Sequence, residues 1–185
     1  MSEIMERLRT DHANFRRLLE LVDHEIGLFR QAERPDYLLL RAIIEYFEDY
    51  PAQCHHPVED LVYLKLKARA PETAARIADL EAEHDKESQR LQTFSELIHR
   101  VMLDRIIPRE TVIGAAQAFI LHVRTHLEME EAHFFSVAEE NLADEDWRTI
   151  DREISERLDP LFHSISLDQI EGLRDHILDS YHEGP

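Results

Sequence analysis

The sequence contains few of the residues that build loops and covalent cross-links. Among 185 residues there are only 4 glycines, 7 prolines and a single cysteine, Cys54. Because glycine and proline mark turns, a chain with so few of them is expected to be mostly helical. One cysteine cannot form an intrachain disulfide, which excludes the class of small secreted domains held by disulfides. A reducing cytoplasm is therefore the expected location.

Long apolar runs and an excess of positive charge are also missing. No stretch approaches the roughly 18 consecutive apolar residues that a membrane-spanning helix needs. The first residues lack the pattern of a signal peptide. Acidic residues outnumber basic ones, 39 to 21, and the formal net charge is -18. Nucleic acids and anionic membrane surfaces repel such a chain, so we expect neither as a partner.

The chain does contain four long segments in which apolar residues recur every three or four positions, the spacing of an amphipathic helix. These segments cover about residues 3–31, 36–68, 72–103 and 108–140. Their apolar stripes consist of Ile4, Leu8, Phe15, Leu19, Val22, Ile26 and Phe29; Leu40, Ile44, Phe47, Val62 and Leu66; Ile77, Leu80, Leu91, Phe94, Ile98 and Val101; and Val112, Ala116, Phe119, Val123, Phe134 and Val137.

Prolines and short connections determine the expected topology. Pro51 and Pro57 fall inside the second segment, so we expect a kink or break near residues 50–57. Pro71 and Pro108 stand where the third and fourth segments begin, a favoured place for proline. Connections this short make neighbouring helices antiparallel. The sequence therefore predicts an all-α fold, an up-down-up-down four-helix bundle with additional C-terminal helices.

The last part of the chain carries a weaker pattern. Apolar spacing suggests one helix from Trp147 to Leu158 and another over residues 167–181, separated at Asp159-Pro160. We therefore expect a bundle over residues 1–140 and a C-terminal helical extension over residues 141–185 that packs on it. The extension would serve as a cap or as a contact between copies of the chain.

Histidine and glutamate occur where the apolar stripes should continue. The first and third segments each carry one such histidine, and the second and fourth each carry a His-x-x-x-Glu pair. This i,i+4 spacing places both side chains of a pair on one helix face. A rise of about 1.5 Å per residue puts all six side chains in one layer about 7 Å thick. They are His12, His55, Glu59, His84, His126 and Glu130.

Imidazole and carboxylate groups gathered inside a helix bundle indicate a metal site. A single histidine on an apolar face is more often a hydrogen-bonded core residue, and one His-x-x-x-Glu pair is a common coincidence. Two pairs at the same height, facing two further histidines, favour metal binding. Because no thiolate accompanies them, the set disfavours structural zinc and iron–sulfur clusters. It suits iron or manganese, as one or two ions.

The order of these motifs resembles the hemerythrin-like family, whose signature is His, then His-x-x-x-Glu, then His, then His-x-x-x-Glu. The resemblance covers about residues 1–140. It implies a four-helix bundle around a non-haem di-iron centre. The matching runs are Asp11-His12, His55-His56-Pro57-Val58-Glu59-Asp60, Glu83-His84-Asp85 and His126-Leu127-Glu128-Met129-Glu130-Glu131.

The resemblance also implies roles for individual residues. Glu59 and Glu130 would bridge two iron ions, with an oxo or hydroxo group completing the bridge. Members of the family bind or sense dioxygen, respond to nitric oxide or peroxide, or help to repair damaged iron centres. The terminal ligands would be the signature histidines, His12, His55, His84 and His126.

One position departs from the family pattern. Oxygen-carrying members have a second histidine one turn after the third-segment histidine, where this chain has Ser88. His56, which we favour and count among the metal ligands, or Glu87 could supply the missing donor, and His122 is a further reserve. A reduced ligand count favours a sensor or repair role over reversible oxygen carriage.

Together these features favour a non-haem di-iron protein that binds or senses dioxygen, nitric oxide or peroxide, with a possible role in iron-centre or redox stress response, rather than an enzyme. One alternative is a di-iron enzyme of the oxidase or peroxidase type, although such enzymes carry Glu-x-x-His pairs and more carboxylates. Another is a metal-stabilised scaffold whose acidic surface docks a protein.

The expected partners are a small diatomic ligand or peroxide, and a second copy of the chain at the C-terminal helices. Cys54, next to His55, is expected to be a small buried apolar residue. A redox role for Cys54 would need an accessible thiol of lowered pKa.

Overall fold

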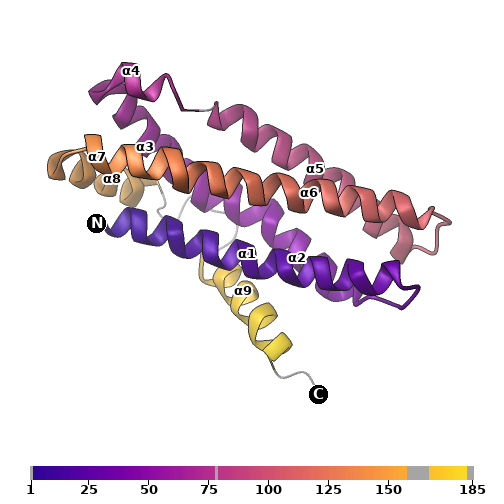
Figure 1. Cartoon of the computed structure of the whole chain (residues 1–185). Helices are drawn as coiled ribbons and strands as arrows, with labels where there is room; N and C mark the ends of the chain where they lie inside the picture. Colours follow the sequence, from indigo (N-terminus) through magenta and orange to yellow (C-terminus); the bar gives the residue numbers. More distant parts are fainter. Residues whose placement is uncertain (1, 78, 158–166, 183–185) are drawn as a thin grey trace.

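The computed structural model describes residues 2–77, 79–157 and 167–182, and within these ranges the chain is helical, with no β-strand. The all-α class is therefore confirmed (Figure 1). The break expected at Asp159-Pro160 lies outside the described residues. The helices are α1 (Glu3–Arg30), α2 (Tyr37–Tyr50), α3 (His56–Arg69), α4 (Pro71–Ala74), α5 (Leu80–Met102), α6 (Arg109–Met129), α7 (Ser136–Asn141), α8 (Asp144–Arg157) and α9 (Leu167–His182), with π-helical segments η1 (Pro51–His55) and η2 (Glu130–Phe135).

Side-chain caps fix where the long helices α1, α2 and α5 begin. The Ser2 side chain accepts a hydrogen bond from the Met5 amide at the start of α1. Asp36 accepts from two amides in the first turn of α2. Asp79 accepts from the Ala82 amide at the start of α5. Such caps satisfy amide groups that have no partner within the helix itself.

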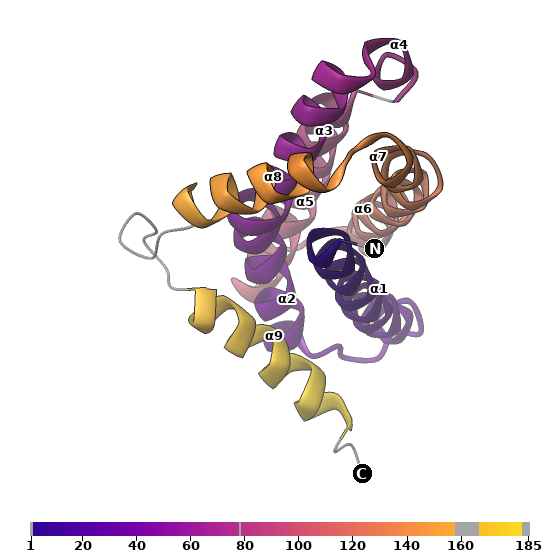
Figure 2. The same ribbon diagram turned by 90° about the vertical axis from the view of Figure 1, so that its left-hand side faces the viewer.

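The long helices pack side by side as a bundle. α1 contacts α2 and α6, and α5 also contacts α2 and α6, so each long helix has two neighbours (Figures 1 and 2). The chain turns at residues 31–36 and 103–108 at the same end of the bundle (Figure 1). Helices α8 and α9 lie against the outer side of the second long segment, which consists of α2, η1 and α3. α8 contacts α3, and α9 contacts α2 (Figure 2).

The start of the third long helix differs from the sequence-based expectation. Pro71 begins only the single-turn helix α4, and α5 starts at Leu80. The Asp79 cap accounts for this second start, because its side chain replaces the intrahelical partner of the Ala82 amide. Ile77, which we assigned to the helical stripe, instead packs against the core from the connection.

The expected interruption near Pro51 and Pro57 takes the form of the π-helical segment η1. Pro57 has no backbone N–H, so it cannot continue the ladder of i,i+4 hydrogen bonds. The His56 amide instead bonds to the carbonyl of Pro51, five residues earlier. The second π-helical segment, η2, contains no proline and was not predicted. Both segments lie at the His-x-x-x-Glu pairs, because η1 ends at His55 and η2 begins at Glu130.

The apolar core is divided into two clusters by a polar layer. On α1, residues up to Leu8 belong to one cluster and residues from Phe15 onward belong to the other. His12 lies between them. On the α6–η2 side, the division falls between Leu127 and Phe134. The candidate ligands therefore interrupt the core at one level along the bundle.

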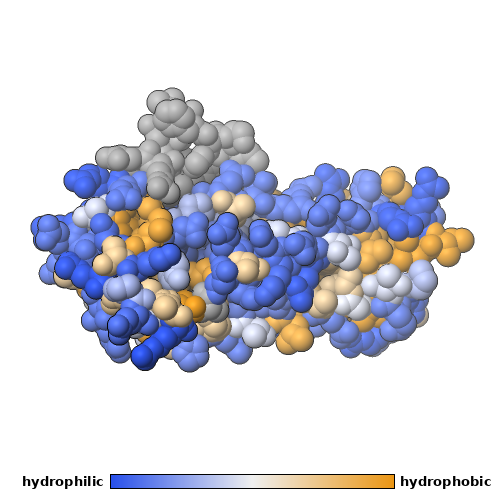
Figure 3. Space-filling model, turned by 90° about the horizontal axis from the view of Figure 1, so that it is seen from above, coloured by the Kyte–Doolittle hydropathy of each residue, from blue (hydrophilic) through white to orange (hydrophobic). Residues whose placement is uncertain are grey.

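The face of the molecule seen in Figure 3 is mostly hydrophilic in its coloured part. Among the described residues, no helix is both long enough and apolar enough to cross a membrane. In the described part of the chain, the large apolar side chains that remain exposed are Leu38, Leu64, Leu103, Ile106 and Leu121.

The difference between buried and exposed leucines gives a test of this packing. Leu18 on α1 is 0% exposed, whereas Leu121 on α6 is 68% exposed. Leu18→Ala should lower the free energy of unfolding by about 2–5 kcal/mol, because it leaves a cavity in the core. Leu121→Ala should change it by less than about 0.5 kcal/mol. Urea unfolding of both variants measures the difference, and equal effects would contradict the placement of α1.

Candidate metal centre

The structure brings together all six residues of the expected layer, and they come from every side of the bundle. Their side chains are almost completely buried; that of His84, at 12% exposure, is the most accessible of the set. The contributing residues are His12 from α1, His55 from η1, Glu59 from α3, His84 from α5, His126 from α6 and Glu130 from η2.

The Glu59 carboxylate lies between two histidine groups, one made of His12 and His55 and the other containing His84. Its Oε1 atom is 3.4 Å from His55 Nε2 and 3.8 Å from His12 Nε2. Its Oε2 atom is 3.4 Å from His84 Nε2. One oxygen therefore faces the histidines of α1 and η1, and the other faces the histidine of α5.

Glu130 is placed in the same way from the opposite side. Its Oε2 atom is 3.5 Å from His12 Nε2. Its Oε1 atom is 3.0 Å from His126 Nε2 and 3.7 Å from His84 Nε2. Both carboxylates thus present one oxygen to each of two histidine groups, the arrangement that a pair of bridging carboxylates requires.

These groups do not satisfy one another by hydrogen bonds. Within the described part of the chain, no hydrogen-bond partner is found for either oxygen of Glu59 or Glu130, or for Nε2 of His84 and His126. Leaving a buried carboxylate unpartnered is costly. The donor atoms of His12, His55, Glu59 and Glu130 lie within 4.8 Å of one another, and those of His56, His84 and His126 do so as well. Nitrogen and oxygen donors of this kind fit iron or manganese, and would also accept zinc.

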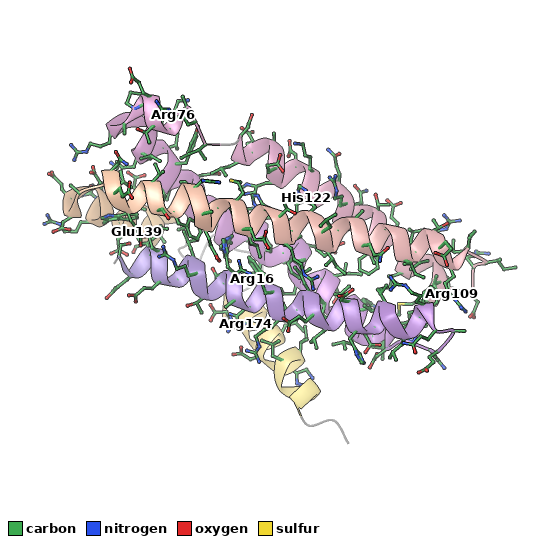
Figure 4. The ribbon with its side chains drawn as sticks, in the orientation of Figure 1. Arg16, Arg76, Arg109, His122, Glu139 and Arg174 are labelled. Atoms are coloured by element: carbon green, nitrogen blue, oxygen red, sulfur yellow. The ribbon has the colours of Figure 1, made fainter. Side chains whose placement is uncertain are left out.

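Two further carboxylates orient the histidines of α1 and η1. Asp11 Oδ2 is 3.1 Å from His55 Nδ1, and its Oδ1 accepts a hydrogen bond from the Tyr50 hydroxyl at 2.9 Å. On the other side, Glu131 Oε1 is 2.9 Å from His12 Nδ1. Arg16, labelled in Figure 4, donates to the same oxygen at 2.8 Å.

These outer contacts direct the Nε2 atoms inward. When Nδ1–H of each ring donates to a carboxylate, Nε2 of the neutral ring carries a lone pair. The Nε2 atoms of His12 and His55 face each other at 3.1 Å. Two nitrogen lone pairs repel at that distance unless a proton lies between them or a metal ion binds them. Carboxylates that hold the outer nitrogen of a ligating histidine are a common feature of metal sites.

Electrostatic coupling within the layer is strong. Burial disfavours the charged form of His55, but the Glu59 and Asp11 carboxylates outweigh burial and raise its pKa above the usual range. Burial also lowers the pKa of His84, but the Glu130 and Glu59 carboxylates outweigh burial and raise this pKa to about 9. Protons on these rings therefore balance the carboxylates in the metal-free chain, and a bound metal ion would displace them.

His56 is placed differently from the other histidines. Its ring is stacked on that of His84, with centroids 3.6 Å apart and planes 8° apart. A metal ion lies close to the plane of each imidazole that binds it, so two parallel stacked rings cannot share one ion without rotation. Burial lowers the pKa of His56 well below its usual value, which keeps the ring neutral. Metal binding by His56 stays a prediction.

The other two reserve residues are near the layer but outside the two groups of close donors. Glu87 is buried, and this burial raises its pKa to about 6. Nε2 of His122, labelled in Figure 4, donates to the backbone carbonyl of Glu83 at 3.1 Å, so that nitrogen is already occupied. Burial raises the pKa of the Cys54 thiol to about 11, and Cys54 is part of the apolar core. This disfavours a redox role for Cys54.

The contacts of Asp11, Glu131 and Tyr50 were missed by sequence reasoning. Asp11 and Glu131 are each adjacent to a candidate ligand in the sequence, which was the only available signal. Each contacts a histidine on a different helix, and the periodicity of a single helix contains no information on such contacts.

Comparison with known proteins identifies one match. The family model described as the hemerythrin HHE cation-binding domain matches residues 3–138. Comparison with curated proteins and with solved structures found no match. The matched range contains every residue of the polar layer and ends before α8.

The contact between Asp11 and His55 predicts that a substitution of Asp11 weakens metal binding, although Asp11 is not itself a candidate ligand. Asp11→Asn should weaken metal affinity by about tenfold or more, because the amide no longer reliably accepts from His55 Nδ1. Asp85→Asn, at an exposed position beside His84, should leave affinity unchanged. Competition with a chelating dye measures both variants, with helix content as a check of folding. Equal affinity in the two variants would show that Asp11 does not orient His55.

Proposed function

Because the chain belongs to the hemerythrin HHE cation-binding family, we propose that it holds two non-haem iron ions in the polar layer and binds or senses dioxygen, nitric oxide or peroxide. The observation that supports this most directly is that each carboxylate directs one oxygen toward each of the two histidine groups. When bound, an iron pair supplies a redox-active centre that can exchange electrons with a small oxidant.

Each residue of the layer has a defined part in this proposal. Glu59 and Glu130 would hold both ions, one oxygen to each. His12 and His55 would complete one position, while His84 and His126 would complete the other. Asp11 and Glu131 keep the protons of His55 and His12 on the outer nitrogens, so that Nε2 stays free for the metal. The surrounding apolar clusters limit the access of bulk water.

The choice of iron follows from the donors. Four imidazole nitrogens with two carboxylates and no thiolate suit a redox-active first-row metal better than a structural zinc site. Histidines outnumber carboxylates in the layer, which favours binding or sensing over an oxidase or peroxidase enzyme, whose sites are richer in carboxylates. A role in iron-centre or redox stress response belongs to the same proposal.

Two further parts of the proposal concern the setting of the protein. A cytoplasmic location is supported by the single, buried thiol of Cys54, since such a chain forms no intrachain disulfide. Self-association through the C-terminal helices is a second part, and sedimentation of the purified protein measures it directly.

The proposal predicts the metal content and reactivity of the purified protein. Protein expressed with added iron should contain about two iron ions per chain. After anaerobic reduction, its absorption spectrum should change on addition of at least one of dioxygen, nitric oxide or hydrogen peroxide. Folded protein with little iron, or with iron that responds to none of the three, would contradict the proposal.

A matched pair of variants tests the assigned ligands in the same experiment. Glu130→Ala removes a carboxylate that serves both positions and should lose about one iron ion per chain or more. Glu128→Ala removes an exposed carboxylate of α6 two residues away and should keep the full iron content.

A further inference from the structure

A small cavity lies beside the candidate metal centre, between α2, η1 and α5. Its volume is about 120 Å³, enough for roughly four water molecules at about 30 Å³ each. The exposed residues Glu48 and Ser88 lie at its opening. Much of the remaining wall is apolar, with Phe47, Pro51 and Leu91 among its residues. Ser88 is the position at which the sequence lacks the second histidine of the third segment, so a small side chain leaves this space open.

Glu87 is the buried carboxylate in the wall of this cavity. It is 5% exposed. Among the described residues no hydrogen bond or ion pair is found for its carboxylate, although the charges of His126 and His84 lower its pKa against the larger effect of burial. Its oxygens also lie outside both groups of close donors. A buried carboxylate is stable only when donors reach it. Water or another small donor molecule in the cavity can supply those hydrogen bonds.

His56 separates the cavity from the ligand layer. Its ring lines the cavity and is also stacked on His84 at a centroid distance of 3.6 Å. A molecule in the cavity is therefore one imidazole ring away from a residue of the candidate metal centre. The histidines on the other side, His12 and His55, are held by Glu131 and Asp11 instead.

We propose that this cavity is a binding site for hydrogen peroxide, with the Glu87 carboxylate accepting hydrogen bonds from its O–H groups. The inference deepens the proposed function and depends on it, because the metal pair would lie beyond the His56 ring. A carboxylate only accepts hydrogen bonds, and hydrogen peroxide has two O–H donors. Dioxygen and nitric oxide have none. Either gas would displace water from Glu87 and leave the carboxylate without a donor, whereas peroxide replaces the lost contacts.

The first experiment compares the three oxidants in rapid mixing with the reduced, iron-loaded protein. Glu87→Leu should lower the second-order rate constant for hydrogen peroxide by about tenfold or more, because a hydrogen bond to a charged group is lost. The rate constants for dioxygen and nitric oxide should stay within about twofold. Glu81→Leu, at an exposed position of the same helix, is the matched control and should leave all three rates unchanged. A uniform effect on the three oxidants, or no effect on peroxide, would overturn the proposal.

The variant Glu87→Gln distinguishes a specific effect of the carboxylate from a folding defect in Glu87→Leu. The carboxamide keeps the size of the side chain and one accepting oxygen, so the loss for peroxide should be smaller than in Glu87→Leu but still selective. Both variants should keep the iron content of the unaltered protein. A drop in iron content on Glu87→Gln would show that Glu87 is a metal ligand instead, which also overturns the proposal.

A second readout is independent of redox reactions. In the zinc-loaded protein, addition of hydrogen peroxide should shift the amide resonance of Ser88 in nuclear magnetic resonance spectra, and Glu87→Leu should abolish the shift. If iron fails to bind while this shift is present, the proposed function fails and the peroxide site stands. If iron binds normally and the shift is absent, the peroxide site fails and the proposed function stands.

Discussion

Two carboxylates, Glu59 and Glu130, lie in the middle of an apolar bundle with no exposed surface and no hydrogen bonds from the described residues. This is the constraint on which the rest of the site depends, because buried negative charge must be balanced. Histidines from each long helix surround the pair, and protons on His55 and His84 provide balance in the absence of metal. A site that requires positive charge at this point is well suited to hold metal ions. The helices supply the ligands, and the two apolar clusters on either side hold the helices in place.

The two halves of the layer are not equivalent. On one side, Asp11 and Glu131 hold the outer nitrogens of His55 and His12, and Tyr50 and Arg16 hold those carboxylates in turn. On the other side, His126 Nδ1 has no hydrogen-bond partner within the described ranges, and His84 is covered by the ring of His56. Anionic partners make a ligating imidazole more basic. The side without them adjoins the small cavity at Ser88 and Glu87. The carboxylates that hold His12 and His55 and the small cavity thus lie on opposite sides of the same layer.

Much of this arrangement could be predicted from the sequence, because it depends on regular helix geometry. The i,i+4 spacing and the rise per residue sufficed to bring His12, His84 and the two His-x-x-x-Glu pairs to one level. The interruption near Pro51 was predictable from the missing N–H of Pro57. The π-helical segment at Glu130 was not, since it contains no proline or glycine to mark it. The separate start of α5 depends on the Asp79 cap, and an aspartate in a helical pattern is too common to identify a boundary. The stacking of His56 on His84 is a contact between helices, and only the packed structure defines it.

In the proposed site, each of the two carboxylates serves two metal positions. The most direct test is an anomalous diffraction map of crystals of the protein loaded with iron. We expect two peaks about 3.5–4 Å apart, with one oxygen of Glu59 and one of Glu130 bound to each. A single peak, or two peaks with each carboxylate bound to one ion only, would contradict it.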